Sequence, residues 1–153
     1  MQPQIVSKPA FAVVGMKYRG KADGDKLKNL WNQFGPHMAD LRDAVNPNVC
    51  YGVMGNYDEA SGEFDYVAGC EVKNTATAPV NMTRWDVPAQ KYAVFACTLP
   101  TMEQAHNFAY QQWLPQSGYR HAAGPEFELY DEKFNPQDPA ATMYIYVPIV
   151  SAN

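Results

Sequence analysis

Apolar and polar positions in the first half of the chain change from an extended spacing to a helical one and back. Residues 4–18 have the composition of an extended segment, which Pro9 restricts to a sheet edge or a bend. An apolar stripe with helical spacing follows, formed by Leu27, Leu30, Trp31, Phe34, Met38 and Leu41. The Gly-Pro pair at 35–36 should kink or interrupt this helix. Residues 50–57 and 63–72 are strand-like and joined by a turn-rich connection, so this half predicts the order strand–helix–strand–strand.

The second half predicts the same order after a polar linker at 74–81. The expected elements are strands at 82–87 and 90–98, a helix at 101–113, and strands at 126–132 and 142–150. The Thr-x-x-Gln pattern of Thr101 and Gln104 predicts a capping box at the start of this helix.

The two halves also resemble each other in sequence. The segment 31–36 recurs 79 residues later at 110–115, where Trp-Asn-Gln-Phe-Gly-Pro becomes Tyr-Gln-Gln-Trp-Leu-Pro. We therefore expect a single α+β domain over 1–153, made of duplicated strand–helix–strand–strand modules near 1–78 and 79–153. The expected architecture is an antiparallel sheet with two main helices and a ligand cleft between the halves.

Alternation along the last two strands predicts which side chains lie together. Residues i and i+2 of a strand share a face, so the aliphatic side chains at 143, 145, 147 and 149 should lie under a helix. Phe127 and Leu129 likewise form a core side. If the strands pair, we expect four residues to gather on the face away from the helices, namely Glu128, Tyr130, Tyr144 and Tyr146. Spacing alone is equally consistent with an ordinary solvated sheet face.

Composition and charge restrict the class of ligand. Charged residues make up 18% of the chain and aromatic residues 13%, including 10 Tyr and 3 Trp, which suits either a pocket lining or an aromatic core. The net charge is −4 and no cluster of Lys and Arg occurs, so direct binding of nucleic acid is not expected. A small cationic molecule fits an acidic protein better.

Several chemical classes lack their motifs. Cys50, Cys70 and Cys97 are widely spaced, without a metal-type Cys-x-x-Cys pair, and we expect no metal and no cofactor. His37, His106 and His121 are isolated, and we expect them at the surface or in a loop. Nothing resembles a signal peptide, and no stretch reaches the ~20 apolar residues of a membrane span. We therefore expect a cytoplasmic protein with no membrane partner.

Six segments in order resemble the GyrI-like effector-binding family, the ligand-sensing domain of many AraC-type and MerR-type multidrug regulators. The segments are 9–15 (PAFAVVG), 51–53 (YGV), 64–69 (FDYVAG), 88–95 (PAQKYAVF), 113–119 (WLPQSGY) and 124–130 (GPEFELY). The resemblance covers nearly the whole chain. It implies a duplicated fold with a ligand cleft between the halves.

The resemblance also implies a ligand and a site. Family members bind bulky aromatic, often cationic, molecules with stacked rings and a carboxylate, which by motif position is Glu128. Further candidates for lining the cleft are Trp113, Tyr92 and Trp85, of which Trp113 and Tyr92 are equally good core residues. The family's helix-turn-helix module is not found in these residues. We therefore expect a free-standing sensor or sequestering protein, monomeric or a weak homodimer.

Two alternatives remain open from the sequence. Some similar family members hydrolyse reactive aromatic natural products, and here Glu128 would orient a water while a tyrosine such as Tyr146 donates a proton. Others resemble inhibitors that shield DNA gyrase, which would make this chain a modulator of another protein. The conventional hydrolase and phosphate-binding motifs are absent.

Overall fold

The computed structural model describes residues 2–74 and 76–153, so Thr75 of the predicted linker at 74–81 lies outside the described residues. The strands are β1 (Gln4–Lys8), β2 (Phe11–Gly20), β3 (Cys50–Gly55), β4 (Phe64–Val72), β5 (Thr83–Val87), β6 (Gln90–Cys97), β7 (Tyr119–His121), β8 (Glu126–Tyr130) and β9 (Met143–Ser151). The helices are α1 (Gly24–Phe34), α2 (Met102–Phe108) and α3 (Leu114–Gln116). The predicted α+β class and the order of its elements are confirmed, and the short β7 is an addition.

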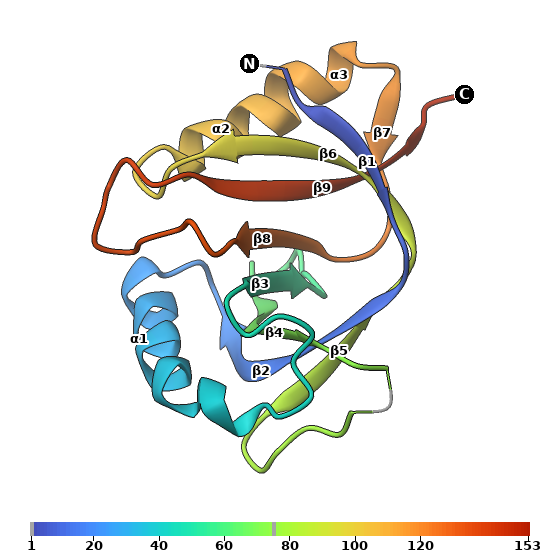
Figure 1. The fold of residues 1–153 in the computed structure, drawn as a ribbon. Helices are drawn as coiled ribbons and strands as arrows, with labels where there is room; N and C mark the ends of the chain where they lie inside the picture. The colour runs from blue at the N-terminus through green and yellow to red at the C-terminus, as the bar shows by residue number, and fades with distance from the viewer. Residues whose placement is uncertain (1, 75) are drawn as a thin grey trace.

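The sheet is antiparallel throughout, and its order is symmetrical about its centre. The strands follow one another as β1-β6-β9-β8-β3-β4-β2-β5, with β7 added beside β9. The first strand of each half pairs with the second strand of the other half, because β1 lies on β6 and β5 lies on β2. The halves meet at the β3–β8 pair, which lies in the middle of Figure 1. A continuous sheet therefore crosses the seam between the halves.

The first helix begins and ends at sequence signals. The carboxylate of Asp23 accepts hydrogen bonds from the backbone N–H groups of Asp25 and Lys26, at 3.0 and 3.2 Å, and so caps the N-terminus of α1. The α-helix ends at Phe34 and continues as a 3-10 helix, Gly35–Asp40, with Pro36 in its first turn. The predicted interruption at the Gly-Pro pair is confirmed.

The predicted capping box of the second helix is wrong. Thr101 has φ −104° and ψ 4°, which is not the extended conformation of a capping residue, and its side chain makes no capping hydrogen bond. Its hydroxyl instead accepts a hydrogen bond from the backbone N–H of Thr98 at 3.0 Å. The Thr101 hydroxyl is therefore engaged in a local turn with Thr98 and does not cap the helix. Beyond α2 the helix passes through a π-helical segment, Ala109–Trp113, into α3.

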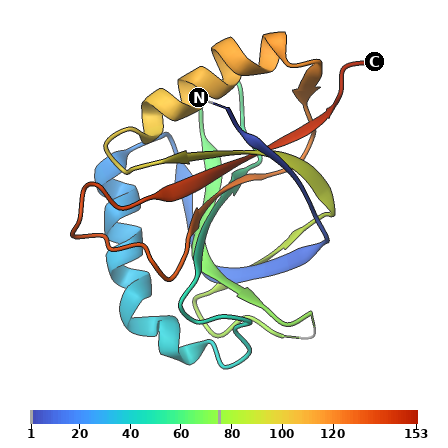
Figure 2. The ribbon, with the colours of Figure 1, turned by 45° about the horizontal axis from the view of Figure 1, so that its top comes forward.

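Both main helices cover the same face of the curved sheet, one on each half (Figures 1 and 2). Phe34 of α1 packs on the first half in a cluster that includes Tyr66, and Ala105 of α2 packs on the second half against Ile145. The aliphatic residues at 143, 145, 147 and 149 lie under α2, as predicted. A third cluster, around Phe127, fills the opposite, inner face. In the described part of the chain, no helix has the length and apolarity needed to cross a membrane.

Candidate ligand-binding site

Two buried carboxylates occupy the helix-bearing face where the halves meet. Glu126 and Glu128 lie two residues apart on β8 and are 7% and 8% exposed. Glu128 faces Gly52 in the register of the β3–β8 pair, at the centre of the sheet. The polar centre of the molecule therefore coincides with the seam between its halves.

Hydrogen bonds lead from Trp31 of α1 through Tyr66 to Glu128, and Tyr130 is a second donor to the same carboxylate. The hydroxyls of Tyr66 and Tyr130 both donate to Oε1 of Glu128, at 2.7 and 2.8 Å. The indole Nε1–H of Trp31 donates to the Tyr66 oxygen at 3.0 Å. Strand β4 thus supplies one phenol, β8 the other, and α1 the indole that covers them.

The same rings surround the carboxylate. The Trp31 ring meets Tyr66 and Tyr130 edge to face, with centroids 6.5 and 5.5 Å apart. Gly52 leaves the room that this arrangement needs, because a Cβ there would collide with the Tyr66 hydroxyl and approach Oε1 of Glu128 to 2.7 Å. We name Trp31, Tyr66, Glu128 and Tyr130 the Glu128 cluster.

Glu128 lies outside the ion pairs that the described residues form. In the part of the chain that the structure describes, no Lys, Arg or His forms an ion pair with it. Burial, with the charge of Glu126, raises the pKa of Glu128 above its ordinary value; the hydrogen bonds from Tyr66 and Tyr130 and the charge of His106 oppose this only in part. No ion pair with the described residues therefore compensates the ionised carboxylate of Glu128.

Glu126 has the opposite environment. Its Oε2 lies 3.1 Å from Nε2 of His106 and accepts a 2.7 Å hydrogen bond from Tyr110, while Oε1 accepts one of 3.2 Å from Tyr57. Burial acts to raise the pKa of Glu126, but the hydrogen bond and charge of His106 and the two phenols overcome it and lower the pKa. The expectation that His106 is exposed and isolated is wrong, because its ring reaches from α2 to this carboxylate.

The predicted grouping of Glu128 with three tyrosines is half right. Tyr130 lies with Glu128, but Tyr144 and Tyr146 do not. In the β8–β9 ladder Glu128 faces Ile145, whereas Phe127 faces Tyr146. Residues directly opposite each other in an antiparallel pair share a face, so the two tyrosines lie on the inner face, away from Glu128. Of the tyrosines that the hydrolase alternative could use, Tyr146 therefore lies on the face opposite Glu128, whereas Tyr130 donates a hydrogen bond to it.

The other three candidate residues pack in cores. Tyr92 is buried on the inner face, 5.1 Å from the Phe127 ring, and Trp85 belongs to the same cluster. Trp113 lies under the second helix with its ring centroid 5.6 Å from that of Phe95. For Tyr92 and Trp113, the alternative prediction that they are core residues therefore agrees with where they lie.

Sequence reasoning missed Trp31, Tyr66, Glu126 and Tyr110 as members of the seam. Tyr66 and Trp31 lie 62 and 97 positions before Glu128, so no local spacing links them to it. Glu126 carried a signal, because it shares the face of Glu128 by alternation. Gly52 carried another, since a glycine inside a strand often marks a close approach.

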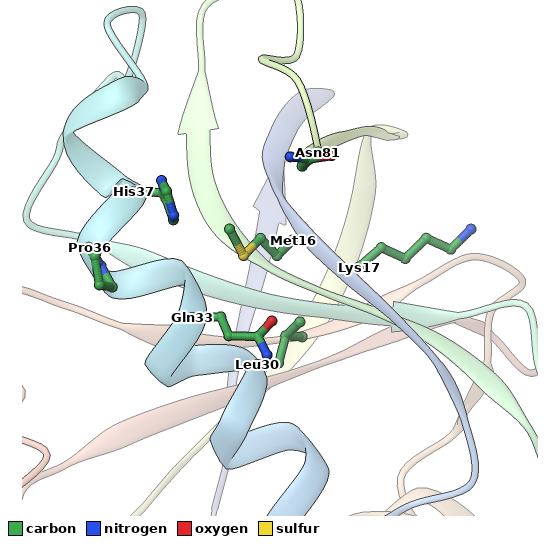
Figure 3. A pocket seen from close by; sticks show the side chains of 7 residues that line it. All are labelled: Met16, Lys17, Leu30, Gln33, Pro36, His37 and Asn81. Carbon is green, nitrogen blue, oxygen red and sulfur yellow. The ribbon is translucent and has the colours of Figure 1, made fainter.

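Side chains close the seam, and a separate cavity lies beside it. A cavity of about 520 Å³ opens between α1 and β2 (Figure 3). Its lining residues are Met16, Lys17, Leu30, Gln33, Pro36, His37 and Asn81. Neither buried glutamate lines it. Of the three rings around Glu128, Trp31 and Tyr130 are partly exposed and Tyr66 is buried.

Comparisons with known proteins agree with this fold. Residues 4–149 match the family model Cass2, described as an integron-associated effector binding protein. The chain is 41% identical over 152 residues to the transcriptional regulator BrlR of Pseudomonas aeruginosa, and this match covers 97% of the chain but only 56% of BrlR.

Solved structures with the same fold include SAV2435 bound to tetraphenylphosphonium, at a TM-score of 0.76 and 17% identity over 98% of this chain and 94% of that one. The integron cassette protein Cass2 of Vibrio cholerae gives a TM-score of 0.65 at 20% identity, over 98% and 97% of the two chains.

Proposed function

The chain belongs to the Cass2 family of integron-associated effector-binding proteins, in line with its resemblance to GyrI-like domains, and we propose that it binds bulky aromatic cations at Glu128. One observation carries the proposal. A carboxylate buried at the seam is hydrogen-bonded by two phenols and forms no ion pair with any described Lys, Arg or His.

The charge of the ligand follows from that environment. Burial without a cation disfavours the ionised carboxylate, and an arriving cation supplies the missing charge and favours ionisation. A neutral molecule of the same shape gains nothing from this. The rings of Trp31, Tyr66 and Tyr130 add cation–π attraction of about 0.5–2 kcal/mol each, depending on how dry the contact is. Ring contacts tolerate many shapes, so we expect a broad range of aromatic cations.

Access to the carboxylate requires Trp31 to move. Its indole is partly exposed at the edge of the seam and is held by one hydrogen bond to Tyr66 and by edge-to-face ring contacts. Displacing it uncovers Tyr66, Tyr130 and the carboxylate together. The displaced indole then becomes one wall of the occupied site.

The relatives support this class of ligand and suggest its use. The structure of SAV2435, which has the same fold, contains tetraphenylphosphonium, a bulky aromatic cation. BrlR is a transcriptional regulator, and the present chain spans 56% of its length. We propose that the bound state serves effector sensing or sequestration, linked to the control of transcription.

Two ions of equal shape and opposite charge test the proposal. Isothermal titration calorimetry in sodium buffer should show tetraphenylphosphonium binding at least about tenfold more tightly than tetraphenylborate, a difference of about 1.4 kcal/mol. Glu128→Gln should remove that preference, while the exposed Glu103→Gln on α2 should keep it. Equal affinities of the wild type for both ions, or an unchanged preference in Glu128→Gln, would contradict the role of the carboxylate.

A further inference from the structure

Two cysteines lie side by side across the first pair of central strands. Cys50 begins β3, and in the β3–β4 ladder Tyr51 faces Gly69, so the next pair along is Cys50 and Cys70. Both side chains pack in the α1-side core, and both thiols are free. Cys50 is partly exposed, whereas Cys70 is 1% exposed. Cys50 is therefore the more accessible residue of the pair.

The spacing suits a covalent bridge. Residues directly opposite each other in an antiparallel pair have Cα atoms about 4.5 or 5.5 Å apart. Disulfides join cysteines whose Cα atoms are roughly 4.4–6.8 Å apart. A bond between these two thiols consequently needs rotation of the side chains and no rearrangement of the sheet.

The two thiols differ in reactivity. The Cys70 thiol can donate a hydrogen bond to the Cys50 sulfur and so lowers the pKa of Cys50, with burial opposing it. The pKa of Cys70 is raised by the same interaction and by burial. Cys50 is accordingly the thiol that reacts first, since the thiolate is the nucleophile.

We propose that Cys50 and Cys70 form a reversible oxidation site for hydroperoxides. The Cys50 thiolate attacks the terminal peroxide oxygen, the O–O bond breaks, and Cys50 becomes a sulfenic acid while the alkoxide takes up a proton and leaves as an alcohol, or as water from hydrogen peroxide. The Cys70 thiol then attacks the Cys50 sulfur. The S–S bond forms as the S–O bond of the sulfenic acid breaks, and the leaving hydroxide takes up the Cys70 proton to give water. Two thiols are oxidised and one peroxide is reduced.

The location connects this site to the Glu128 cluster. Cys50 faces Tyr130 in the β3–β8 ladder, and Tyr130 donates to Glu128. A bridge between Cys50 and Cys70 fixes the start of β3 beside that tyrosine. The oxidation site nevertheless stands on the thiol pair alone and does not depend on which ligand Glu128 takes.

Thiol counting and peptide mapping test the proposal on the whole chain. Brief hydrogen peroxide treatment should lower the number of titratable thiols in the denatured protein from three to one, and dithiothreitol should restore all three. A mass map without reductant should show one linked pair of peptides, joining Cys50 to Cys70. Three free thiols after a dose that oxidises glutathione, a bridge only between molecules, or sulfinic acid at Cys50 without a bridge would each overturn it.

The third cysteine provides a matched control. Burial raises the pKa of Cys97 to about 11, and its sulfur lies 3.2 Å from that of Met143. Cys97→Ser should therefore still form the bridge, whereas Cys70→Ser should stop at a sulfenic acid on Cys50 that dimedone traps. An equal dimedone yield in Cys70→Ser and in the wild type would argue against Cys70 as the second thiol. If Cys70→Ser does not fold, the wild-type peptide map decides.

Discussion

Gly52 and Glu128 lie directly opposite each other at the centre of the β3–β8 pair, and the missing side chain of Gly52 gives the carboxylate and the Tyr66 hydroxyl their space. The two positions face each other across the seam of the duplicated fold. One carries the buried charge and the other carries nothing, so the ligand-binding chemistry proposed here depends on a difference between the halves rather than on their likeness.

Gly52→Ala should disrupt the Glu128 cluster. The added methyl group would collide with the Tyr66 hydroxyl, so either the Tyr66–Glu128 hydrogen bond breaks or the strands shift. We expect a loss of about 1–3 kcal/mol in the free energy of unfolding, measured by urea denaturation. Gly24→Ala is the matched control, because a Cβ at the start of α1 meets no atom within 4 Å. If Gly52→Ala is as stable as Gly24→Ala, the close approach is not real.

Tyr146→Ala should affect the fold rather than the ligand. The Tyr146 ring stacks on Phe127 with centroids 4.4 Å apart, on the inner face of the sheet. Removing it should lower the free energy of unfolding by about 2–4 kcal/mol, while tetraphenylphosphonium affinity of the folded protein stays within about twofold of the wild type. Thermal melting and calorimetry measure the two quantities. If Tyr146→Ala is stable but no longer binds tetraphenylphosphonium, Tyr146 belongs to the ligand-binding site.

Trp31→Phe should accelerate ligand association. The phenyl ring keeps an apolar cover but cannot donate to Tyr66, so the cover loses a hydrogen bond of about 0.5–1.5 kcal/mol. Stopped-flow fluorescence with a rhodamine dye should show a severalfold higher association rate constant. Trp85→Phe, on the inner face, should leave the rate unchanged. Equal rates in both variants would mean that the indole is not the part that opens.

The pair of His106 and Glu126 should make stability decline as pH rises above about 6.5. Burial acts to lower the pKa of His106, but the hydrogen bond and charge of Glu126 raise it above 6.5. A raised pKa in the folded state means that the stabilisation is complete below about 6.5 and is lost as pH rises through the raised value. Urea denaturation from pH 6 to 9 should show this decline in the wild type.

His106→Gln should flatten that decline, because the variant has no proton to lose in this range. His37→Gln, on the exposed 3-10 helix, should keep the wild-type slope. A slope that persists in His106→Gln would assign the pH dependence to another group.

Local signals in the sequence were sufficient for the order of the elements. The Gly-Pro pair at 35–36 ends α1 because proline lacks the N–H that an α-helix needs, and this holds wherever the helix packs. The Thr101 signal failed because a neighbouring backbone N–H, also local, competes for the same hydroxyl. A capping residue such as Thr101 therefore caps its helix only where no nearer backbone N–H takes its hydroxyl.

The site could be predicted only in part, because it depends on strand register. Glu128 and Tyr130 share one strand, so alternation alone places them together. Tyr146 lies on another strand, and a shift of one residue in pairing decides which residues of β8 share its face. The pattern of β9 placed its aliphatic residues and its tyrosines correctly, but on β8 the acidic side, and not the Phe127 side, lies on the helix-bearing face. Trp31 and Tyr66 join the cluster through tertiary packing, which no spacing reveals.

The exchange of β1 and β5 means that neither half of the chain is a complete folding unit. A fragment ending near the linker would keep β1 but lose its partner β6. It would also keep β2 but lose β5, which pairs with β2. Two such fragments expressed together would be driven to complement each other. A molecule bound where they meet would hold together a structure that neither piece can form alone.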